Sequence, residues 1–185
     1  MKNHLVITRA LQLLTVLAVT GFCSLAQAQV DNIAVQLALD GEQSMLNVTT
    51  RGNCSDNNHN GCVSVHQGKQ ARINFTLVGN KQCNRADGGG WELGEVYLGG
   101  KNSQGKPGYW GNLDGEVQAD FNVADAASGQ LNGESGSNDQ SIVIFDANNY
   151  EYDIWYKVTA VCVDGSGSVV DTVETDPRIK NGGTE

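Results

Sequence analysis

The chain has 185 residues, and 21 acidic against 12 basic residues give it a formal charge of −9 at neutral pH. Nucleic acids and anionic lipid surfaces are bound through Lys and Arg side chains that displace counterions, so a chain this acidic repels both. The composition therefore excludes nucleic acid and anionic membranes as expected partners. The length predicts one domain large enough to bury a real core.

The first residues predict a cleaved signal peptide over residues 1–28. Lys2 and Arg9 precede an apolar run from Leu11 to Leu25, and small residues end it at Ala26 and Ala28. A basic start, an apolar core too short to cross a bilayer comfortably and small residues before the cut are the features that signal peptidase needs. We expect an exported chain, periplasmic or secreted, that comprises residues 29–185 and has no membrane span. Removal of the peptide takes away two basic residues and no acidic one, which leaves a charge of −11.

Four cysteines remain after this cut, and an even number in an oxidising compartment predicts two disulfides. Three pairings are open. Cys54 and Cys62 enclose only the turn-rich loop SDNNHNG, whose ends meet at little entropic cost, so we favour Cys54–Cys62. By elimination, Cys83 pairs with Cys162, and their Cα atoms should lie within about 7 Å of each other.

The hydrophobic pattern along the chain has a period of two. Strand-length segments alternate or run apolar over residues 34–37, 71–77, 117–123 and 142–145, and Asn, Asp and Gly clusters separate them. No helix of ordinary length is visible. The pattern predicts an all-β protein, a single antiparallel immunoglobulin-like β-sandwich.

A glycine-rich excursion covers residues 79–115, which contain eleven glycines. The apolar positions change from odd to even numbers across Gly94 and Glu95, which predicts a β-bulge. We expect turns at residues 88–90 and 99–100, and a loop over the glycine-rich residues 128–138.

The carboxyl-terminal part predicts a hairpin. Apolar residues alternate along one face from Tyr152 to Cys162, residues 164–167 form a turn, and a second strand follows at residues 169–173. This hairpin resembles the last hairpin of immunoglobulin-like and fibronectin-type sandwiches. The ending from Asp176-Pro177 to Gly183 resembles that of the DP-EP family of small bacterial β-proteins. That resemblance implies a fold but no activity.

A candidate calcium site lies in the first cysteine loop. Asp56, Asn58 and Asn60 place oxygen-bearing side chains at alternate positions before Gly61, as at the start of a calcium-binding loop. Position twelve of such a loop is Gln67 and not the expected glutamate. The alternative is a polar turn closed by a disulfide, in which Asn, Asp and Gly adopt positive φ angles. Calcium is the one cofactor that the sequence suggests.

Aromatic side chains among the glycines form a second candidate site. Trp91, Tyr97, Tyr109 and Trp110 could hold a sugar ring or a protein partner on an exposed surface. The alternative is that Trp91 belongs to the core, as Trp155 would, and that Tyr109 and Trp110 pack against a sheet edge. Because Trp110 lies between flexible glycines, we expect it to be the most exposed tryptophan of the three.

No residue constellation predicts a reaction, and we name no catalytic residue. The chain lacks a Gly-x-Ser-x-Gly elbow, and its cysteines are used in disulfides. We expect a non-enzymatic exported module that binds an unknown protein or glycan. The alternatives are a calcium-assisted glycan-binding module and a carbohydrate-active hydrolase on the same fold, for which Glu92, Glu95, Asp114 and Glu116 are the acids near the aromatic residues.

Overall fold

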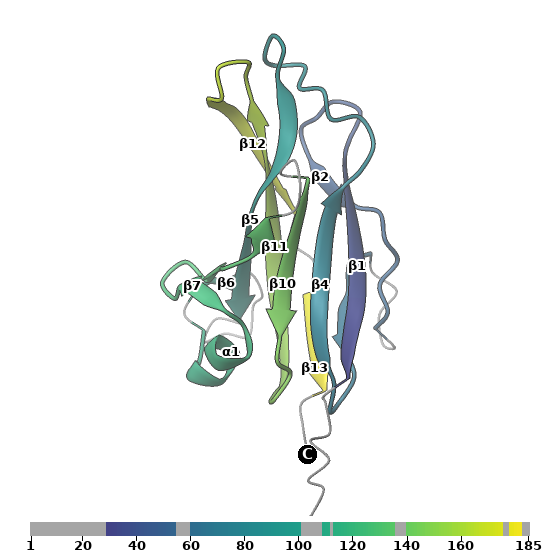
Figure 1. Ribbon diagram of the computed structural model, residues 1–185, viewed down its shortest axis with the longest axis vertical. Helices are drawn as coiled ribbons and strands as arrows, with labels where there is room; N and C mark the ends of the chain where they lie inside the picture. Colours follow the sequence, from purple (N-terminus) through teal and green to yellow (C-terminus); the bar gives the residue numbers. More distant parts are fainter. Residues whose placement is uncertain are drawn as a thin grey trace, which may run out of the picture.

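The computed structural model describes residues 29–54, 60–100, 109–111, 113–135, 140–175 and 178–182, and for residues 100, 109, 110, 135 and 178–182 only the backbone. These residues form two β-sheets (Figure 1) and contain two disulfides, which confirms the predicted sandwich. The predicted signal peptide lies outside the described residues. Among the residues described, no helix is long and apolar enough to span a membrane.

The first sheet has the strand order β2-β1-β4-β10-β9. Its strands are β1 (Val30–Leu39), β2 (Leu46–Val48), β4 (Gln70–Leu77), β9 (Glu134–Ser135) and β10 (Ser141–Asp146). The strands β1 and β4 pair in parallel, whereas the other pairs of this sheet are antiparallel. The parallel pair arises because the chain leaves this sheet after β2, contributes β3 to the other sheet and then returns, a crossover that parallel strands require.

The second sheet has the order β3-β13-β11-β5-β8-β7, with β12 paired to β11 and β6 to β5. Its strands are β3 (Val63–Val65), β5 (Gly90–Gly100), β6 (Tyr109–Trp110), β7 (Val123–Asp125), β8 (Gln130–Leu131), β11 (Glu151–Val163), β12 (Val169–Thr175) and β13 (Arg178–Gly182). The pair β13 and β3 is also parallel. The sandwich is therefore antiparallel, as predicted, except at the two parallel pairs β1 with β4 and β13 with β3.

The predicted hairpin of the carboxyl-terminal part is confirmed as β11 and β12. The strands β12 and β13 run along the same edge of β11, because Val158 pairs with Thr175 and Trp155 with Arg178. The prediction missed β13, whose residues carry no clear alternation of apolar and polar side chains.

The core lies between the sheets and is filled by the inward positions of β1, β4, β5, β10 and β11. Phe75 of β4 contacts Tyr156 of β11 across it, with ring centroids 5.1 Å apart, and Trp91 is fully buried. The Tyr156 hydroxyl donates to the Gly61 carbonyl oxygen at 2.7 Å, which satisfies the one polar atom of a buried ring. Burial raises the pKa of Tyr156 above its usual value.

Both predicted disulfides are confirmed. Cys54–Cys62, here called the short-loop disulfide, has a Cα separation of 5.8 Å, and Cys83–Cys162, the long-loop disulfide, has one of 5.9 Å. The two bridges close loops of very different length, with sequence separations of 8 and 79.

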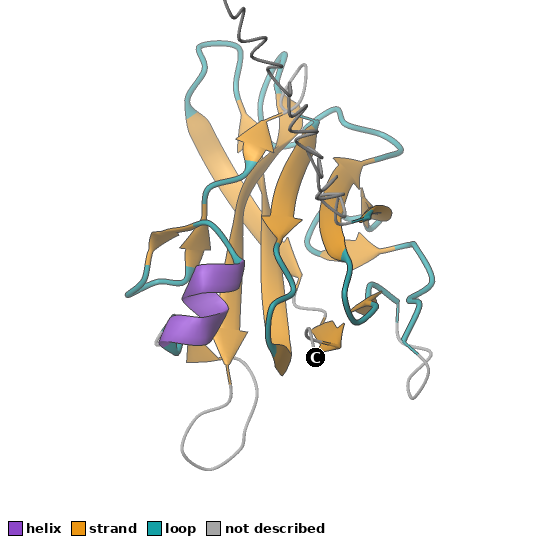
Figure 2. Cartoon of the chain, turned by 60° about the horizontal axis from the view of Figure 1, so that its bottom comes forward, coloured by secondary structure: helices purple, strands orange, loops and turns teal. Residues whose placement is uncertain are grey.

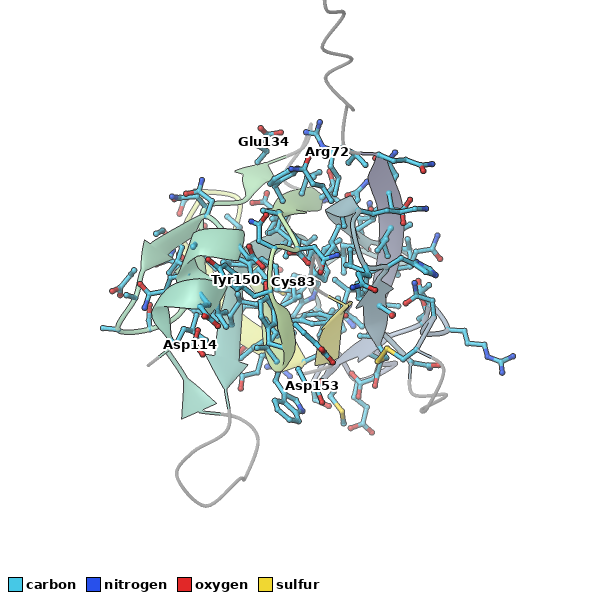
Figure 3. All side chains as sticks on the ribbon, turned by 90° about the horizontal axis from the view of Figure 1, so that it is seen from below. Arg72, Cys83, Asp114, Glu134, Tyr150 and Asp153 are labelled. Atoms are coloured by element: carbon cyan, nitrogen blue, oxygen red, sulfur yellow. A yellow bond between two sulfur atoms is a disulfide. The ribbon has the colours of Figure 1, made fainter. Side chains whose placement is uncertain are left out.

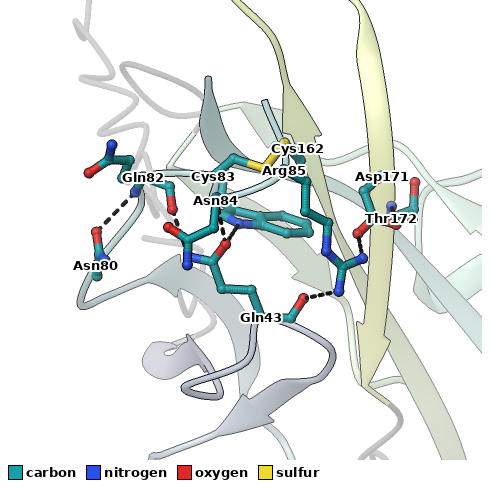
Figure 4. The surroundings of a disulfide bond; sticks show 10 residues. Gln43, Asn80, Gln82, Cys83, Asn84, Arg85, Cys162, Asp171 and Thr172 are labelled. Atoms are coloured by element: carbon teal, nitrogen blue, oxygen red, sulfur yellow. Dashed lines mark hydrogen bonds and ion pairs between the residues drawn. A yellow bond between two sulfur atoms is a disulfide. The ribbon is translucent and has the colours of Figure 1, made fainter. Parts of the chain in front are cut away.

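A buried glutamine joins the first sheet to the loop that carries the long-loop disulfide (Figure 4). Gln43, in the connection from β1 to β2, accepts hydrogen bonds at Oε1 from Trp91 Nε1 at 3.0 Å and from the Asn84 amide at 2.9 Å. Its Nε2 donates to the Gln82 carbonyl oxygen at 2.6 Å. The Arg85 guanidinium donates to the Gln43 carbonyl oxygen and pairs with Asp171 of β12. These contacts position the ends of three strands around the disulfide.

The predicted β-bulge in β5 is confirmed. Gly94 and Glu95 together lie opposite the single residue Thr159, between the pairs Val96 with Val158 and Leu93 with Ala160. The Glu95 amide donates to the Thr159 hydroxyl at 2.8 Å. A Cβ on Gly94 would lie 2.5 Å from that hydroxyl, so the bulge requires glycine there.

Three local predictions are wrong. Residues 99–100 continue β5 instead of turning, since Gly99 pairs with both β11 and β6. The glycine-rich residues 128–138 contain β8 and β9 among their described positions. The segment 117–123 was predicted as a strand, but a short helix, α1 (Gly115–Asp120), occupies most of it (Figure 2).

The helix forms because Asp114 caps it. The Asp114 side chain accepts a hydrogen bond from the Val117 amide at 2.9 Å, as an N-cap residue does. Val117 and Phe121, four residues apart, are both buried, so they fit the inward face of a helical turn as well as that of a strand. Asp120 is buried too and accepts hydrogen bonds from Asn149 and Tyr152, which join α1 to the start of β11.

Candidate functional site

The structure distributes the predicted aromatic site over two environments. Trp91 is fully buried and donates its indole N–H to Gln43, so it lies in the core and out of reach of a surface ligand. Tyr97 is partly exposed on the outer face of the second sheet. Tyr109 and Trp110 form β6, which pairs with Gly100 and Gly99 of β5, but their side chains lie outside the described part. The expected exposure of Trp110 stays a prediction.

Two of the three candidate calcium residues lie outside the described residues. Asp56 and Asn58 lie among residues that the structure does not describe, and Asn60 is exposed and pairs through its backbone with Arg51. In the described ranges, no three His, Cys, Asp or Glu residues are arranged to hold a metal ion. Calcium therefore stays a prediction of the sequence.

Around Tyr97, four strands bring polar side chains together on the outer face of the second sheet. Tyr97 of β5 pairs with Lys157 of β11 on one side and with Gln130 of β8 on the other. Glu95, one of the two bulge residues, lies two positions before Tyr97, and Glu174 of β12 forms an ion pair with Lys157. We call these five residues, Glu95, Tyr97, Gln130, Lys157 and Glu174, the Tyr97 cluster.

Each side chain of the Tyr97 cluster is held by another. The Tyr97 hydroxyl donates to one carboxylate oxygen of Glu95, and Gln130 Nε2 donates to the other at 2.6 Å. Lys157 Nζ lies 5.0 Å from the centroid of the Tyr97 ring, within the range of a cation–π contact, and 3.0 Å from a carboxylate oxygen of Glu174. The phenol ring is thus fixed in position while one part of it faces solvent.

The surroundings of Tyr97 change its acidity. The hydrogen bond to Glu95, partial burial, and the negative charges of Glu95 and Glu174 raise the pKa of Tyr97 to about 12. Each cause favours the neutral phenol, because ionisation would break the hydrogen bond and add a third negative charge. At neutral pH the hydroxyl is therefore a hydrogen-bond donor and not a nucleophile.

Trp155 extends the cluster along β11. It lies two residues before Lys157, so the alternation of the strand places both on the outer face. Its backbone partners are Gly99 on β5 and Arg178 on β13, and the indole is partly buried. The alternative that placed Trp155 in the core is therefore wrong, because its indole lies on the outer face of β11.

Beside the cluster, an open hollow of about 260 Å³ lies at the edge of the second sheet. Glu95 and Gln130 border it on one side. The remaining lining residues are Gly94, Val96, Leu131, Asn132, Gly133 and Ile142. A partner that contacts the Tyr97 ring could also contact the carboxylate of Glu95 and the amides of Gln130 and Asn132 in this hollow.

The acids named for hydrolysis do not form a pair across this hollow. Both oxygens of Glu95 accept hydrogen bonds from Tyr97 and Gln130, and Asp114 caps α1. Glu116 is exposed in the first turn of that helix. The described geometry gives Glu95 and Asp114 structural roles and leaves Glu116 exposed to solvent.

Sequence reasoning missed Gln130, Lys157 and Glu174. A usable pattern existed for Lys157, because the inward face from Tyr152 to Cys162 was recognised and the residues between must face outward. No local pattern points to Gln130 or Glu174, since only the strand register brings them to Tyr97.

Comparison with known proteins adds no family. No protein-family model matches the chain, and no curated protein matches it significantly. The functional argument therefore depends on the geometry of the molecule alone.

Proposed function

We propose that this protein is an exported, non-enzymatic β-sandwich domain that binds a protein partner through the Tyr97 cluster and Trp155. The observation that carries the proposal is the fixed position of the Tyr97 ring. Its hydroxyl donates a hydrogen bond to Glu95, and the Lys157 ammonium group lies over its face. Aromatic side chains that are ordered before binding lose little entropy in a complex, and Tyr and Trp dominate binding hot spots.

The composition of the surface supports a protein rather than a nucleic acid or a lipid surface. Two partly exposed aromatic residues lie among paired charges, and the chain as a whole is acidic. Interfaces between proteins are enriched in aromatic residues at their centre and polar at their rim. The two disulfides fit an oxidising compartment outside the cytosol, which supports export.

Site-specific photo-crosslinking in the native host tests the proposal. A photoreactive phenylalanine analogue replaces Thr172, which is exposed on β12 beside the cluster, and in a control chain it replaces the exposed Met45 of the first sheet's loop. We expect one defined protein adduct from position 172 and none from position 45. The additional change Tyr97→Ala should reduce the adduct about tenfold, as loss of a hot-spot side chain does. Equal labelling at both positions, or an adduct that persists without Tyr97, contradicts the proposal.

A further inference from the structure

The outer face of the first sheet carries an unusual set of side chains. Apart from Val30 at the start of β1, the outward positions of its two neighbouring strands β1 and β4 hold amides, alanines, one threonine and one arginine. These residues are Asn32, Ala34, Gln36 and Ala38 on β1 and Gln70, Arg72, Asn74 and Thr76 on β4.

Strand propensity does not explain this choice. β4 is interior between β1 and β10, and β1 pairs with β4 over residues 30–37 but with β2 only over residues 37–39. Asn and Ala are depleted in strands, where β-branched and aromatic residues pack better against their cross-strand neighbours. Asn32 and Asn74 are nevertheless exposed on adjacent strands, and the Asn74 side chain accepts a hydrogen bond from the Thr76 hydroxyl at 3.5 Å. Short and amide-bearing side chains here reduce cross-strand packing and leave hydrogen-bonding groups exposed at the surface.

The short side chains create a hollow of about 340 Å³ on this face. Strand register defines two rows of side chains across it. One row runs from Asn32 through Arg72 to Phe145, and the other from Ala34 through Asn74 to Val143. Ala34 is the shortest of these side chains, and each row contributes one amide, Asn32 or Asn74.

The charges of this face cancel. Arg72 forms an ion pair with Glu134 of β9 at 3.1 Å, and Figure 3 shows the two side chains next to each other at the surface. Both side chains are more than half exposed, so this is a surface ion pair that contributes little to stability. The ion pair therefore has no net charge, on a strongly acidic protein, which suits an uncharged ligand.

An exposed aromatic ring completes the face. Phe145 of β10 is 43% exposed, and its backbone partner on β4 is Arg72, so it lies next to the hollow without lining it. An apolar ring near exposed amides offers one surface for C–H groups and another for hydroxyl groups. Sugar rings present both kinds of group, and hydroxyls can donate to and accept from a single amide side chain.

We propose that this hollow binds a neutral glycan chain, with Asn32 and Asn74 hydrogen-bonding to hydroxyl groups and Phe145 packing against a sugar ring. The site lies on the opposite sheet from the Tyr97 cluster and does not depend on the function proposed for that cluster. Two faces would then allow the protein to hold a glycan and a protein partner at once.

Isothermal titration with neutral hexasaccharides tests the proposal. The probes are cellohexaose, maltohexaose and hexa-N-acetylchitohexaose, and a hexamer of galacturonic acid is the anionic control. We expect at least one neutral probe to bind the mature chain with a Kd of about 1 mM or tighter. The acidic control should bind more weakly because the protein is negative overall.

Variants assign the binding to the hollow. The double change Asn32→Ala and Asn74→Ala should weaken binding about tenfold or more. Gln36→Ala is the matched control, since Gln36 is an exposed amide on β1 outside the hollow, and it should leave the Kd unchanged. Unchanged melting temperatures would show that both variants fold.

Two results would overturn the glycan site. The first is that none of the neutral probes binds at about 10 mM, well above the expected Kd. The second is that a probe binds but its affinity falls in Tyr97→Ala and not in the Asn32 and Asn74 double variant. That outcome assigns the glycan to the Tyr97 cluster, and it leaves the photo-crosslinking experiment as a separate test of the protein partner.

Discussion

Replacement of Gln43 by Ala should destabilise the fold more than a loop residue normally does. Gln43 is only 4% exposed and uses both atoms of its amide in hydrogen bonds. Its acceptor serves the indole N–H of Trp91, which is fully buried and has no route to water. Removal of the amide leaves that N–H without a partner.

The magnitude follows from the groups that lose their partners. A buried donor left unsatisfied costs about 1–3 kcal/mol. The other two partners, the Asn84 amide and the Gln82 carbonyl, belong to exposed residues that water can reach, so each lost bond costs about 0.5–1 kcal/mol. We expect Gln43→Ala to reduce the free energy of unfolding by about 2–5 kcal/mol.

Urea denaturation followed by far-ultraviolet circular dichroism measures this change with the disulfides intact. Glu42→Ala is the matched control, because Glu42 is the exposed neighbour in the same loop and should change stability by less than about 0.5 kcal/mol. A double-mutant cycle with Trp91→Phe, which removes the indole N–H, isolates the interaction. In that background the cost of Gln43→Ala should fall by about 1–2 kcal/mol.

The reasoning is refuted if Gln43→Ala costs no more than Glu42→Ala. It is also refuted if the cycle shows no coupling, because the penalty would then come from the loop backbone. Gln43 has a positive φ of 54°, so Gln43→Gly separates these causes. Glycine removes any backbone strain but also the amide, and it should therefore remain destabilising.

Three further predictions concern the bridges, the Tyr97 cluster and the turns. Replacement of both cysteines of a bridge by Ala should lower the free energy of unfolding by about 4–5 kcal/mol for the long-loop disulfide and about 2–3 kcal/mol for the short-loop disulfide. The reason is that the longer loop restricts the entropy of the denatured state more, and a larger loss for the short-loop variant in urea denaturation would contradict it. Alkaline titration followed by absorbance, with Tyr97→Phe as the difference reference, should show Tyr97 ionising near pH 12, and Glu95→Gln should bring it back towards 10. Since the folded pKa is raised, the stability that the Tyr97 proton contributes is complete below pH 10 and is lost as the pH rises through 12; a single titration of all tyrosines near 10 would rule this out. Gly129→Ala should be far more destabilising than Gly167→Ala, because both have positive φ angles but only at Gly129 would a Cβ lie 2.1 Å from a backbone oxygen; equal melting temperatures of the two variants would count against the packing there.

Much of the architecture could be predicted from the residues in order. The alternation from Tyr152 to Cys162 identified the central strand and its buried face, since the period of two is a local property of strand geometry. The change of parity across Gly94 and Glu95 identified the bulge for the same reason. The pairing of Cys54 with Cys62 followed from the small entropy of closing a short loop, which again depends only on the chain.

Other features depended on tertiary contacts. Val117 and Phe121 fit either a strand or a helical turn, and the cap at Asp114 together with the space at the end of the sandwich decided for the helix. The strand β13 has no apolar pattern of its own, and it forms because β11 and β3 offer it hydrogen bonds on both sides.

The candidate sites show the same division. Tyr97 could be named from the sequence as an aromatic residue in a strand, and the outward position of Lys157 is implied by the alternation of β11. That Gln130 and Glu174 would join them, and that Asn32 would lie beside Arg72 across a parallel pair, could not be read from the chain. Alternation specifies which face of a strand a residue occupies, but which residues become neighbours across strands depends on register, and register is set by the packing of the whole sandwich.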